Sequence, residues 1–504
     1  MIPACPSLES KNMNTLSSPS PAAVPHETDA AEPRGWFATL DPARIAGRFA
    51  GLAFAFALLA SLAGLALRVE LLTPALDSVT PRTFGALLSL HGTLMMYFVA
   101  LPLFPGVLGH ALLPSLLGGR AFVFPRLMRA AWHLLALGGA LVAGGFVLGG
   151  TEAGWMFDTL FGGRFTSSGI LTAAIGVLLA ATSLGLMSLN MATTLMLHRR
   201  ATGAALPPLA SALMWSSLLG LVACPILAIC TATVIADRVF DLAVFLPAGG
   251  GSPDLFAAIF RRFSIPAQNM ILLGGLGTVA QVIVSRTGAT RANASFSRLF
   301  GAIAVAGLIA WGGAGAPAAA EGGIAWATLP FTVLIATCAG LAILLCVLAL
   351  RRGFERLDTP LVYALAFLAT LAGALVTGLL LAMPVLQQHL GNTVFSTAHL
   401  HLTMTALLGL AFMAGLHDVW PRLTGRAFSE VAGKAAAVVI LISLHLVSLP
   451  LYSAGRSGAP FRSNAYAEEF TIPHVMAFAG TSLLLAGLAV AVINLIAARR
   501  PAQS

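Results

Sequence analysis

Charged side chains are scarce in this sequence. Asp, Glu, Lys and Arg make up 9% of its 504 residues, whereas hydrophobic residues make up 58%. A soluble domain carries about 25% charged residues, so this composition excludes an ordinary water-soluble globular protein. The mean hydropathy of +0.89 indicates that most of the chain lies in the hydrocarbon region of a membrane.

Lysine is almost absent. Lys11 and Lys434 are the only two lysines, and arginines supply the rest of the positive charge that leaves the chain at +9. Most of these arginines flank apolar segments, which is typical of the positive-inside rule rather than of a basic nucleic-acid-binding face. We therefore predict cytoplasmic amino and carboxyl termini, a location in a bacterial inner membrane, and no nucleic-acid partner.

The five cysteines include no CxxC pair. That spacing is what a zinc site or a thioredoxin-like redox motif would need. Four of the five lie in apolar segments, where an unpaired cysteine behaves as a small hydrophobic residue. The cysteine pattern therefore gives no sign of a metal or redox site of these kinds.

Long apolar runs dominate what is present. Within hydrocarbon every backbone polar group must be satisfied internally, so only helices or closed barrels cross a membrane. Runs of about 20 non-alternating apolar residues predict helices. The predicted fold is an all-α integral membrane protein of about twelve transmembrane helices. The expected spans are residues 45–68, 86–114, 128–150, 168–194, 207–236, 266–285, 297–316, 324–350, 359–383, 395–416, 432–453 and 472–497.

Two segments outside the spans carry further predictions. Residues 1–40 are rich in Pro, Ser and Ala, a composition that predicts a disordered cytoplasmic tail ahead of a transmembrane domain at 41–504. Residues 248–263 are expected to form a long outer loop between spans five and six, which could cap the bundle.

Histidines inside apolar spans are the first candidates for chemistry, because ionisable groups in hydrocarbon are costly. His91 in LHGTLMMYF and the pair His399 and His401 in STAHLHLTM lie at similar depths near the outer ends of their spans. Residues i and i+2 on a helix point about 200° apart, so the pair can serve two different metal centres. One could ligate a haem iron together with His91, and the other could ligate an iron with an open position.

A packing role for these imidazoles is the alternative, and the residues alone leave both open. The remaining histidines in or near spans have no partner at matched depth and are expected to be structural. They are His133, His198, His417, His445 and His474.

Six segments in order resemble subunit I of the haem–copper oxidases. They are LRVELLTP (67–74), HGTLMMYFVALPLFPGVLGHALLPSLLGGRAFVFPR (91–126), GW (154–155), LPAGGGSPDLF (246–256), TAHLHLTMTALLGLAFMAGLHDVWPRLTG (397–425) and GAPFR (458–462). The resemblance covers roughly residues 45–495. It implies a cytochrome c oxidase subunit I-like bundle that binds two haems.

The resemblance also implies roles for individual residues. His91 and His401 would be the axial ligands of a low-spin haem, and His399 the proximal ligand of a high-spin haem. Two further residues match positions beside the low-spin haem, Arg68 and Trp155. Arg462 matches one of a pair of arginines that bind haem propionates, and Phe461 stands in place of the other, which implies weaker propionate binding.

The sequence departs from the family at the copper site. The family motif HPEVY is replaced by IPAQN, so Ile265 stands for a copper-ligating histidine, Ala267 for a glutamate and Asn269 for a tyrosine. The two other copper-ligating histidines lie after a tryptophan in the family, where this chain has Gly312, Gly313 and Ala314 after Trp311. None of these side chains offers a nitrogen ligand for copper, so copper B is predicted to be absent.

The proton-conducting positions implied by the family also lack titratable groups of the expected kind. Ala121 stands for an aspartate and His110 for an asparagine of one path. Leu334 stands for the lysine of the second path. The family's metal-binding His–Asp pair before span ten corresponds to Gly391 and Asn392. We therefore predict that proton pumping is lost.

Three functions are consistent with these residues. The first is a subunit I homologue that carries electrons through two haems without copper B, beside other respiratory subunits and with a cupredoxin-like subunit or cytochrome c at the outer face. The second is a terminal oxidase that reduces oxygen with electrons from cytochrome c, its copper held by residues not recognised here. The third is a haem-based gas sensor or assembly partner, in which the apolar surroundings of Ile265, Gly313 and Ala314 admit a diatomic ligand.

Overall fold

The computed structural model describes residues 39–74, 78–119, 122–151, 154, 168–245, 249–313 and 323–499. Residues 40–504 form one compact unit. The predicted tail at 1–40 lies almost wholly outside the described residues, as do Ala121, Trp155 and Ala314.

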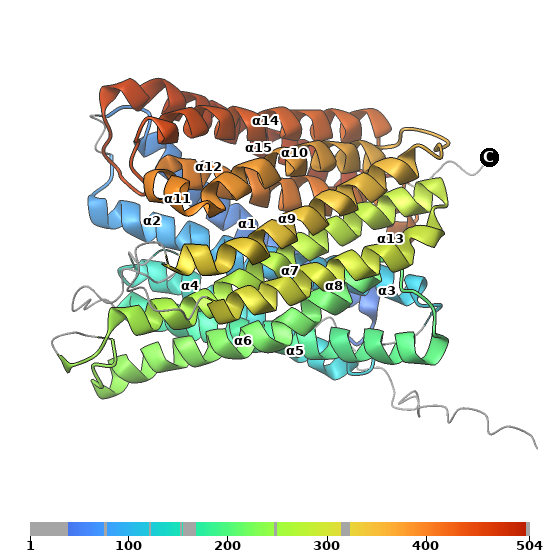
Figure 1. Cartoon of the computed structure of the whole chain (residues 1–504), viewed down its shortest axis with the longest axis horizontal. Helices are drawn as coiled ribbons and strands as arrows, with labels where there is room; N and C mark the ends of the chain where they lie inside the picture. The colour runs from blue at the N-terminus through green and yellow to red at the C-terminus, as the bar shows by residue number, and fades with distance from the viewer. Residues whose placement is uncertain are drawn as a thin grey trace, which may run out of the picture. The chain divides into compact units, whose positions relative to one another are not determined.

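The described part of the chain is helical and contains twelve helices long and apolar enough to cross a membrane. This confirms the predicted fold class. Figure 1 shows the long helices running side by side along the length of the bundle. The principal elements are α1 (Pro42–Glu70), α2 (Pro81–Thr93), η1 (Leu94–Ala100), η2 (Leu103–Gly109), α3 (His110–Leu116), α4 (Pro125–Val147), α5 (Ser168–Thr202), α6 (Pro208–Phe240), α7 (Pro253–Thr287), α8 (Asn293–Gly313), α9 (Gly323–Leu350), α10 (Thr359–Ala382), α11 (Pro384–Leu390), α12 (Val394–Thr405), η5 (Ala406–Ala411), α13 (Phe412–Thr424), α14 (Glu430–Arg456) and α15 (Thr471–Ile496).

The predicted outer loop at 248–263 is wrong for most of its length. Helix α7 begins at Pro253 and continues through Pro266. The local sequence predicts instead that the helix starts at Pro266. Proline at the first helical position and Asp254 in the first turn both favour a helix beginning there. The α7 backbone therefore starts about three and a half turns earlier than expected, and it carries Ile265 inside a continuous helix.

The two spans that carry the candidate histidines are not regular α-helices. The second span, 81–116, passes from α2 into π-helical turns at η1 and η2, and the span at 394–424 contains π-helical turns at η5. Pro102 and Pro105 lie beside or within η2 and lack the amide hydrogens that regular α-turns need. Short π-helical stretches occur frequently at functional sites, and both stretches follow the histidines by about one turn.

Small residues let helices α4 and α5 approach closely. A Cβ atom added at Gly138 would lie 2.6 Å from the Gly176 carbonyl oxygen, and one added at Gly145 would lie 2.8 Å from the Gly169 carbonyl oxygen. Such glycine contacts take the place of a hydrophobic driving force between helices in lipid. The glycine-rich composition of the spans thus serves helix packing.

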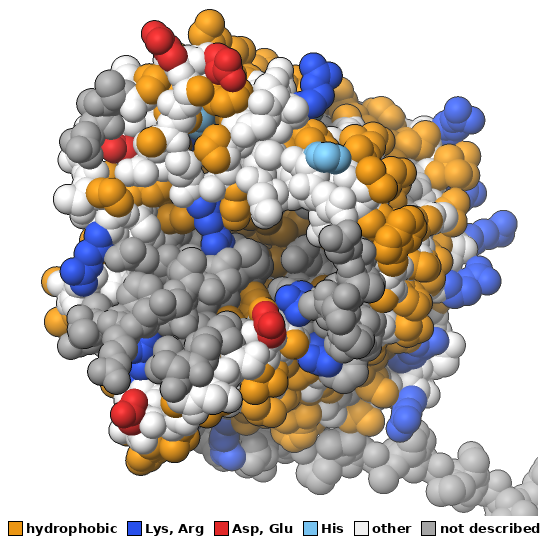
Figure 2. Space-filling model, turned by 60° about the vertical axis from the view of Figure 1, so that its left-hand side comes forward, with side chains coloured by type: hydrophobic (Ala, Val, Ile, Leu, Met, Phe, Trp, Pro, Cys, Tyr) orange, Lys and Arg blue, Asp and Glu red, His pale blue; other side chains and the backbone are white. Residues whose placement is uncertain are grey.

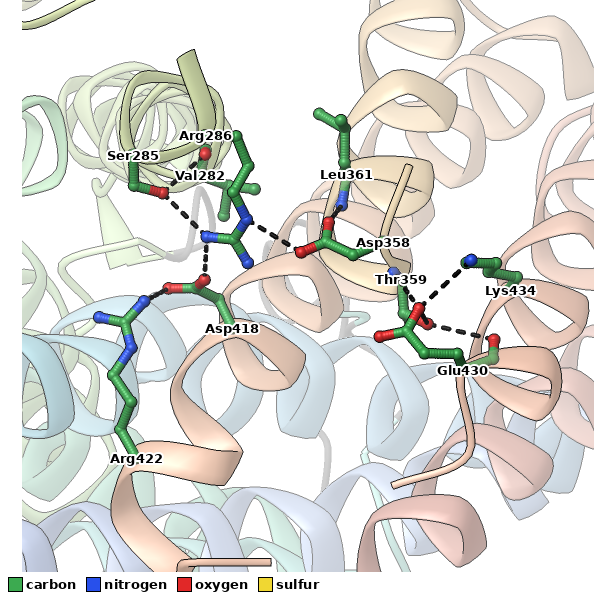
Figure 3. Close-up of polar contacts among 10 residues, drawn as sticks. All are labelled: Val282, Ser285, Arg286, Asp358, Thr359, Leu361, Asp418, Arg422, Glu430 and Lys434. Atoms are coloured by element: carbon green, nitrogen blue, oxygen red, sulfur yellow. Dashed lines mark hydrogen bonds and ion pairs between the residues drawn. The ribbon is translucent and has the colours of Figure 1, made fainter. Parts of the chain in front are cut away.

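A network of charged side chains joins four helices at the bundle end opposite the candidate histidines. Arg286 of α7 bonds Asp358, next to the start of α10, through Nε at 3.0 Å, and it also pairs with Asp418 of α13. Arg422 donates to the other oxygen of Asp418 at 2.6 Å. Glu430 of α14 accepts from the Thr359 amide at 2.8 Å, as Figure 3 shows. The two buried carboxylates of this network, Asp358 and Asp418, are therefore paired with arginine, as burial requires.

Candidate functional site

His91 and His401 face each other across the bundle. Their ring centroids lie 6.2 Å apart and their ring planes differ by 12°. Metal–nitrogen bonds to imidazole are about 2.0–2.1 Å long, so two imidazoles on opposite faces of one iron have centroids about 6 Å apart. The separation of the two rings therefore fits one iron between them.

The tautomers of these two histidines follow from their hydrogen bonds. His91 Nδ1 lies 2.8 Å from the Ala60 carbonyl oxygen of α1, and His401 Nδ1 lies 2.8 Å from the Thr397 carbonyl oxygen. A carbonyl oxygen only accepts, so each Nδ1 carries the proton and each Nε2 has a free lone pair. A hydrogen bond of this kind at the second nitrogen is the usual arrangement for a metal-binding histidine.

Gly64 makes room for the His91 imidazole. A Cβ atom at this position on α1 would lie 2.8 Å from His91 Nδ1 and 3.0 Å from His91 Cε1. Contacts below 3.0 Å are not tolerated without movement, so a larger residue at Gly64 would push the ring away from α1. Sequence reasoning missed this residue, although a glycine about one turn from Arg68 was a possible signal.

His399 contacts a different helix from His401. Its Nδ1 lies 3.0 Å from Thr377 Oγ1 of α10. A Cβ atom at the neighbouring Gly378 would lie 3.1 Å from His399 Cε1. The two histidines of the HxH motif therefore contact different helices, and the prediction that they serve separate metal centres stays a prediction.

Arg68 places a positive charge beside the facing pair. It lies close enough to His91, His401 and His474 to interact with all three electrostatically. The Glu70 side chain, two residues on, is buried and accepts from the Ser78 amide at 3.0 Å. A guanidinium in this position supplies fixed positive charge beside the pair.

Arg462 lies in a segment docked on the start of α12. The Phe461 amide donates to the Asn392 carbonyl oxygen at 3.1 Å. Arg462 has the left-handed φ of 56°, and its guanidinium carbon lies 4.8 Å from the centre of the Phe461 ring. A Cβ atom at Gly154 would lie 3.0 Å from Arg462 Nη2, so a glycine there permits the guanidinium to approach.

The bundle end at which α2 and α12 begin is hollowed. Figure 2 shows hydrophobic side chains within the hollow, and both basic and acidic side chains near its border.

The positions expected to hold copper do not fit a copper ion. Ile265 has no donor atom, and Asn269 Nδ2 donates back to the Ile265 carbonyl oxygen at 3.1 Å. The Asn269 amide packs on α8, because a Cβ atom at Gly307 would lie 2.6 Å from its Nδ2. Gly313 is the last residue of α8. Among the residues that the structure describes, no three His, Cys, Asp or Glu side chains group as metal ligands.

Other polar positions singled out from the sequence have local partners. His133 and His445 bond carbonyl oxygens one turn earlier in their own helices, at 2.7 and 2.8 Å. His417 stacks on Tyr363 with ring centroids 5.0 Å apart, and His110 stacks between Phe49 and Phe122. These contacts hold the four rings within the bundle, and the Nε2 atoms of His110 and His417 are buried without a hydrogen-bond partner among the described residues.

A family comparison matches most of the chain. The model of the family described as cytochrome c and quinol oxidase polypeptide I matches residues 44–485. The cytochrome c oxidase subunit 1 of Synechocystis is 28% identical over 444 residues, covering 85% of this chain and 78% of that protein. A probable cytochrome c oxidase subunit 1-alpha of Streptomyces coelicolor is 28% identical over 473 residues, covering 89% and 78%.

The fold is shared with a solved structure. A heme–copper terminal oxidase dimer determined by cryo-EM superimposes with a TM-score of 0.72 at 17% identity, covering 90% of this chain and 83% of that one. At this identity the likeness concerns the fold.

Proposed function

The chain belongs to the cytochrome c and quinol oxidase polypeptide I family, and from this premise we propose that it binds two haems and carries electrons without copper B. As a multi-pass subunit I-like protein of respiratory electron transport, it would hold a low-spin haem between His91 and His401. His399 would hold a high-spin haem on the other side of α12. The facing geometry of His91 and His401 is the observation that carries the proposal.

The protein's own groups would perform three tasks around the haems. A bound haem supplies a one-electron iron couple, and histidine ligation sets its potential. The free Nε2 atoms of His91 and His401 would hold one iron, while their Nδ1–H bonds keep the rings in place. Arg68 and Arg462 would balance negative charge on haem substituents, and the apolar helix faces would exclude water.

Four-electron oxygen reduction is not part of this proposal. The positions for copper are occupied by Ile265 and Gly313 and, outside the described residues, by Ala314. Asn269 is turned onto its own helix. Proton pumping is likewise excluded from the proposal, because Leu334 and Ala121 cannot carry protons.

The setting of this activity is also proposed. The basic inner loops support a bacterial inner membrane with both termini in the cytoplasm. The electron donor, a cupredoxin-like subunit or cytochrome c, would then dock on the outer face near the hollowed end. Other respiratory subunits would accompany the chain in its complex.

The metal content and spectra of the purified protein test the proposal. Two haems per chain, no copper, and one haem that reacts with carbon monoxide are the expected results. Stoichiometric copper with sustained oxygen consumption from reduced cytochrome c would overturn the proposal in favour of a terminal oxidase. A haem that binds carbon monoxide tightly but exchanges no electrons with a donor would favour a gas sensor.

A further inference from the structure

His399 is the first of three polar side chains linked by hydrogen bonds. His399 Nδ1 of α12 lies 3.0 Å from Thr377 Oγ1 of α10, and the Tyr452 hydroxyl of α14 donates to the same Thr377 oxygen at 3.0 Å. Figure 1 shows α10, α12 and α14 together on one side of the bundle. Three helices therefore contribute one group each, and we call these three linked side chains the Tyr452 relay.

The hydrogen bonds of the relay are compatible with a proton on His399 Nδ1. The Thr377 hydroxyl donates to the Ala374 carbonyl oxygen at 3.1 Å, which uses its single proton. With that proton used, the Thr377 oxygen accepts from the Tyr452 hydroxyl on one side and can accept from His399 Nδ1 on the other. In this arrangement His399 Nδ1 carries the proton, and the Nε2 lone pair is free to bind iron.

The relay goes beyond ordinary helix packing. Thr370, two turns earlier on α10, is buried and bonds only the Ala366 carbonyl oxygen of its own helix at 2.9 Å. Thr377 makes the same kind of bond and accepts two more from other helices. A helical threonine that only satisfies itself does not need these two donors.

The surroundings hold Tyr452 and His399 in place. The Tyr452 ring lies against Phe395 of α12 with centroids 4.6 Å apart. A Cβ atom at Gly455, one turn after Tyr452, would lie 2.7 Å from the Phe395 Cα atom, so α14 is pressed against α12 here. Gly378 leaves space for the His399 ring on α10. Small residues thus allow the approach on both sides of the relay.

We infer that Thr377 and Tyr452 are positioning residues for His399, which set its tautomer and tune the electron density at Nε2. The inference rests on the proposed function, in which His399 holds a high-spin haem. A hydrogen bond accepted from Nδ1–H makes the imidazole a stronger ligand. Tyr452 donates to the same acceptor and weakens it, so the phenol moderates the strength of the ligand.

Resonance Raman spectra of the reduced holoprotein test the relay through the iron–histidine stretching band of the His399 haem. Thr377→Val removes the acceptor and is expected to lower the frequency, whereas Thr377→Ser keeps it near the wild-type value. Tyr452→Phe removes the competing donor and is expected to raise the frequency. Thr370→Val is the matched control on α10 and is expected to leave the band in place.

The outcomes separate the relay from the proposed function. A wild-type protein without a His399 haem band overturns both. An unshifted band in both Thr377→Val and Tyr452→Phe, with haem still bound, overturns the relay alone. The low-spin haem at His91 and His401 reports on folding, so its loss in Thr377→Val together with the His399 band would assign Thr377 a general structural role and overturn the inference.

Discussion

Asp418 of α13 pairs with Arg286 of α7, and the two residues join helices at the bundle end opposite the candidate haem ligands. Asp358 bonds the same guanidinium. Both carboxylates are buried, with 7% of Asp418 and 6% of Asp358 exposed. Arg286 is therefore the cation shared by two carboxylates that have little access to water.

Removal of Arg286 is expected to destabilise the bundle. Arg286→Ala leaves Asp358 and Asp418 close together without their shared cation, and breaking a buried ion pair costs about 3–5 kcal/mol. Partial exposure of the guanidinium places the expected loss at the low end of that range. Thermal unfolding in detergent measures it. Arg298→Ala is the control, because Arg298 Nη2 bonds the exposed Ser295 hydroxyl of its own helix. Equal melting temperatures for the Arg286→Ala and Arg298→Ala variants would contradict the prediction.

The two proposed haems are expected to respond to different histidines. His91→Ala removes one ligand of the facing pair and should abolish the low-spin spectrum while the carbon monoxide-reactive haem stays. His399→Ala should do the reverse. His445→Ala is the control, since His445 bonds the Leu441 carbonyl oxygen of its own helix. Reduced-minus-oxidised and carbon monoxide difference spectra distinguish the low-spin haem from the carbon monoxide-reactive haem. Identical spectra for His91→Ala and His399→Ala would contradict separate haem sites.

Gly64→Ala is expected to disturb the low-spin site although it replaces no proposed ligand. The added methyl group would lie 2.8 Å from His91 Nδ1 and compete with the bond to the Ala60 carbonyl oxygen. Steric overlap of this kind costs about 1–3 kcal/mol. Haem retention during detergent washing and the low-spin absorbance band should both fall. Gly51→Ala lies on the same helix, where a Cβ atom meets nothing within 4 Å, and an equal loss there would argue against the His91 contact.

Arg68→Gln is expected to lower the midpoint potential of the low-spin haem. A nearby positive charge disfavours the oxidised iron, so its removal makes oxidation easier. An interaction of about 1 kcal/mol through protein corresponds to a shift on the order of 40 mV for a one-electron couple. Redox titration of the absorbance band measures the shift. Arg68→Lys keeps the charge and should move the potential less, and a potential that rises in Arg68→Gln would contradict the placement of Arg68.

Local sequence was sufficient for much of the fold. Runs of apolar residues predicted twelve spans because hydrocarbon permits little besides a helix. The same reasoning failed at 248–263, because Pro266 resembles a helix start whereas α7 passes through it from Pro253. A proline inside a long buried helix loses one hydrogen bond but keeps its packing, and packing is not visible in the local sequence.

The candidate site, like the fold, was predicted partly from the local sequence and partly depended on tertiary structure. The HxH spacing of His399 and His401 by itself determined that the two rings point in different directions, because a helix turns by a fixed angle for each residue. Which groups meet each ring depended on tertiary structure. His401 faces His91, from a span about 300 residues earlier, and Thr377 and Tyr452 reach His399 from two further helices. Contacts between distant segments depend on how side chains fill the space between helices, and helical periodicity carries no information about that packing.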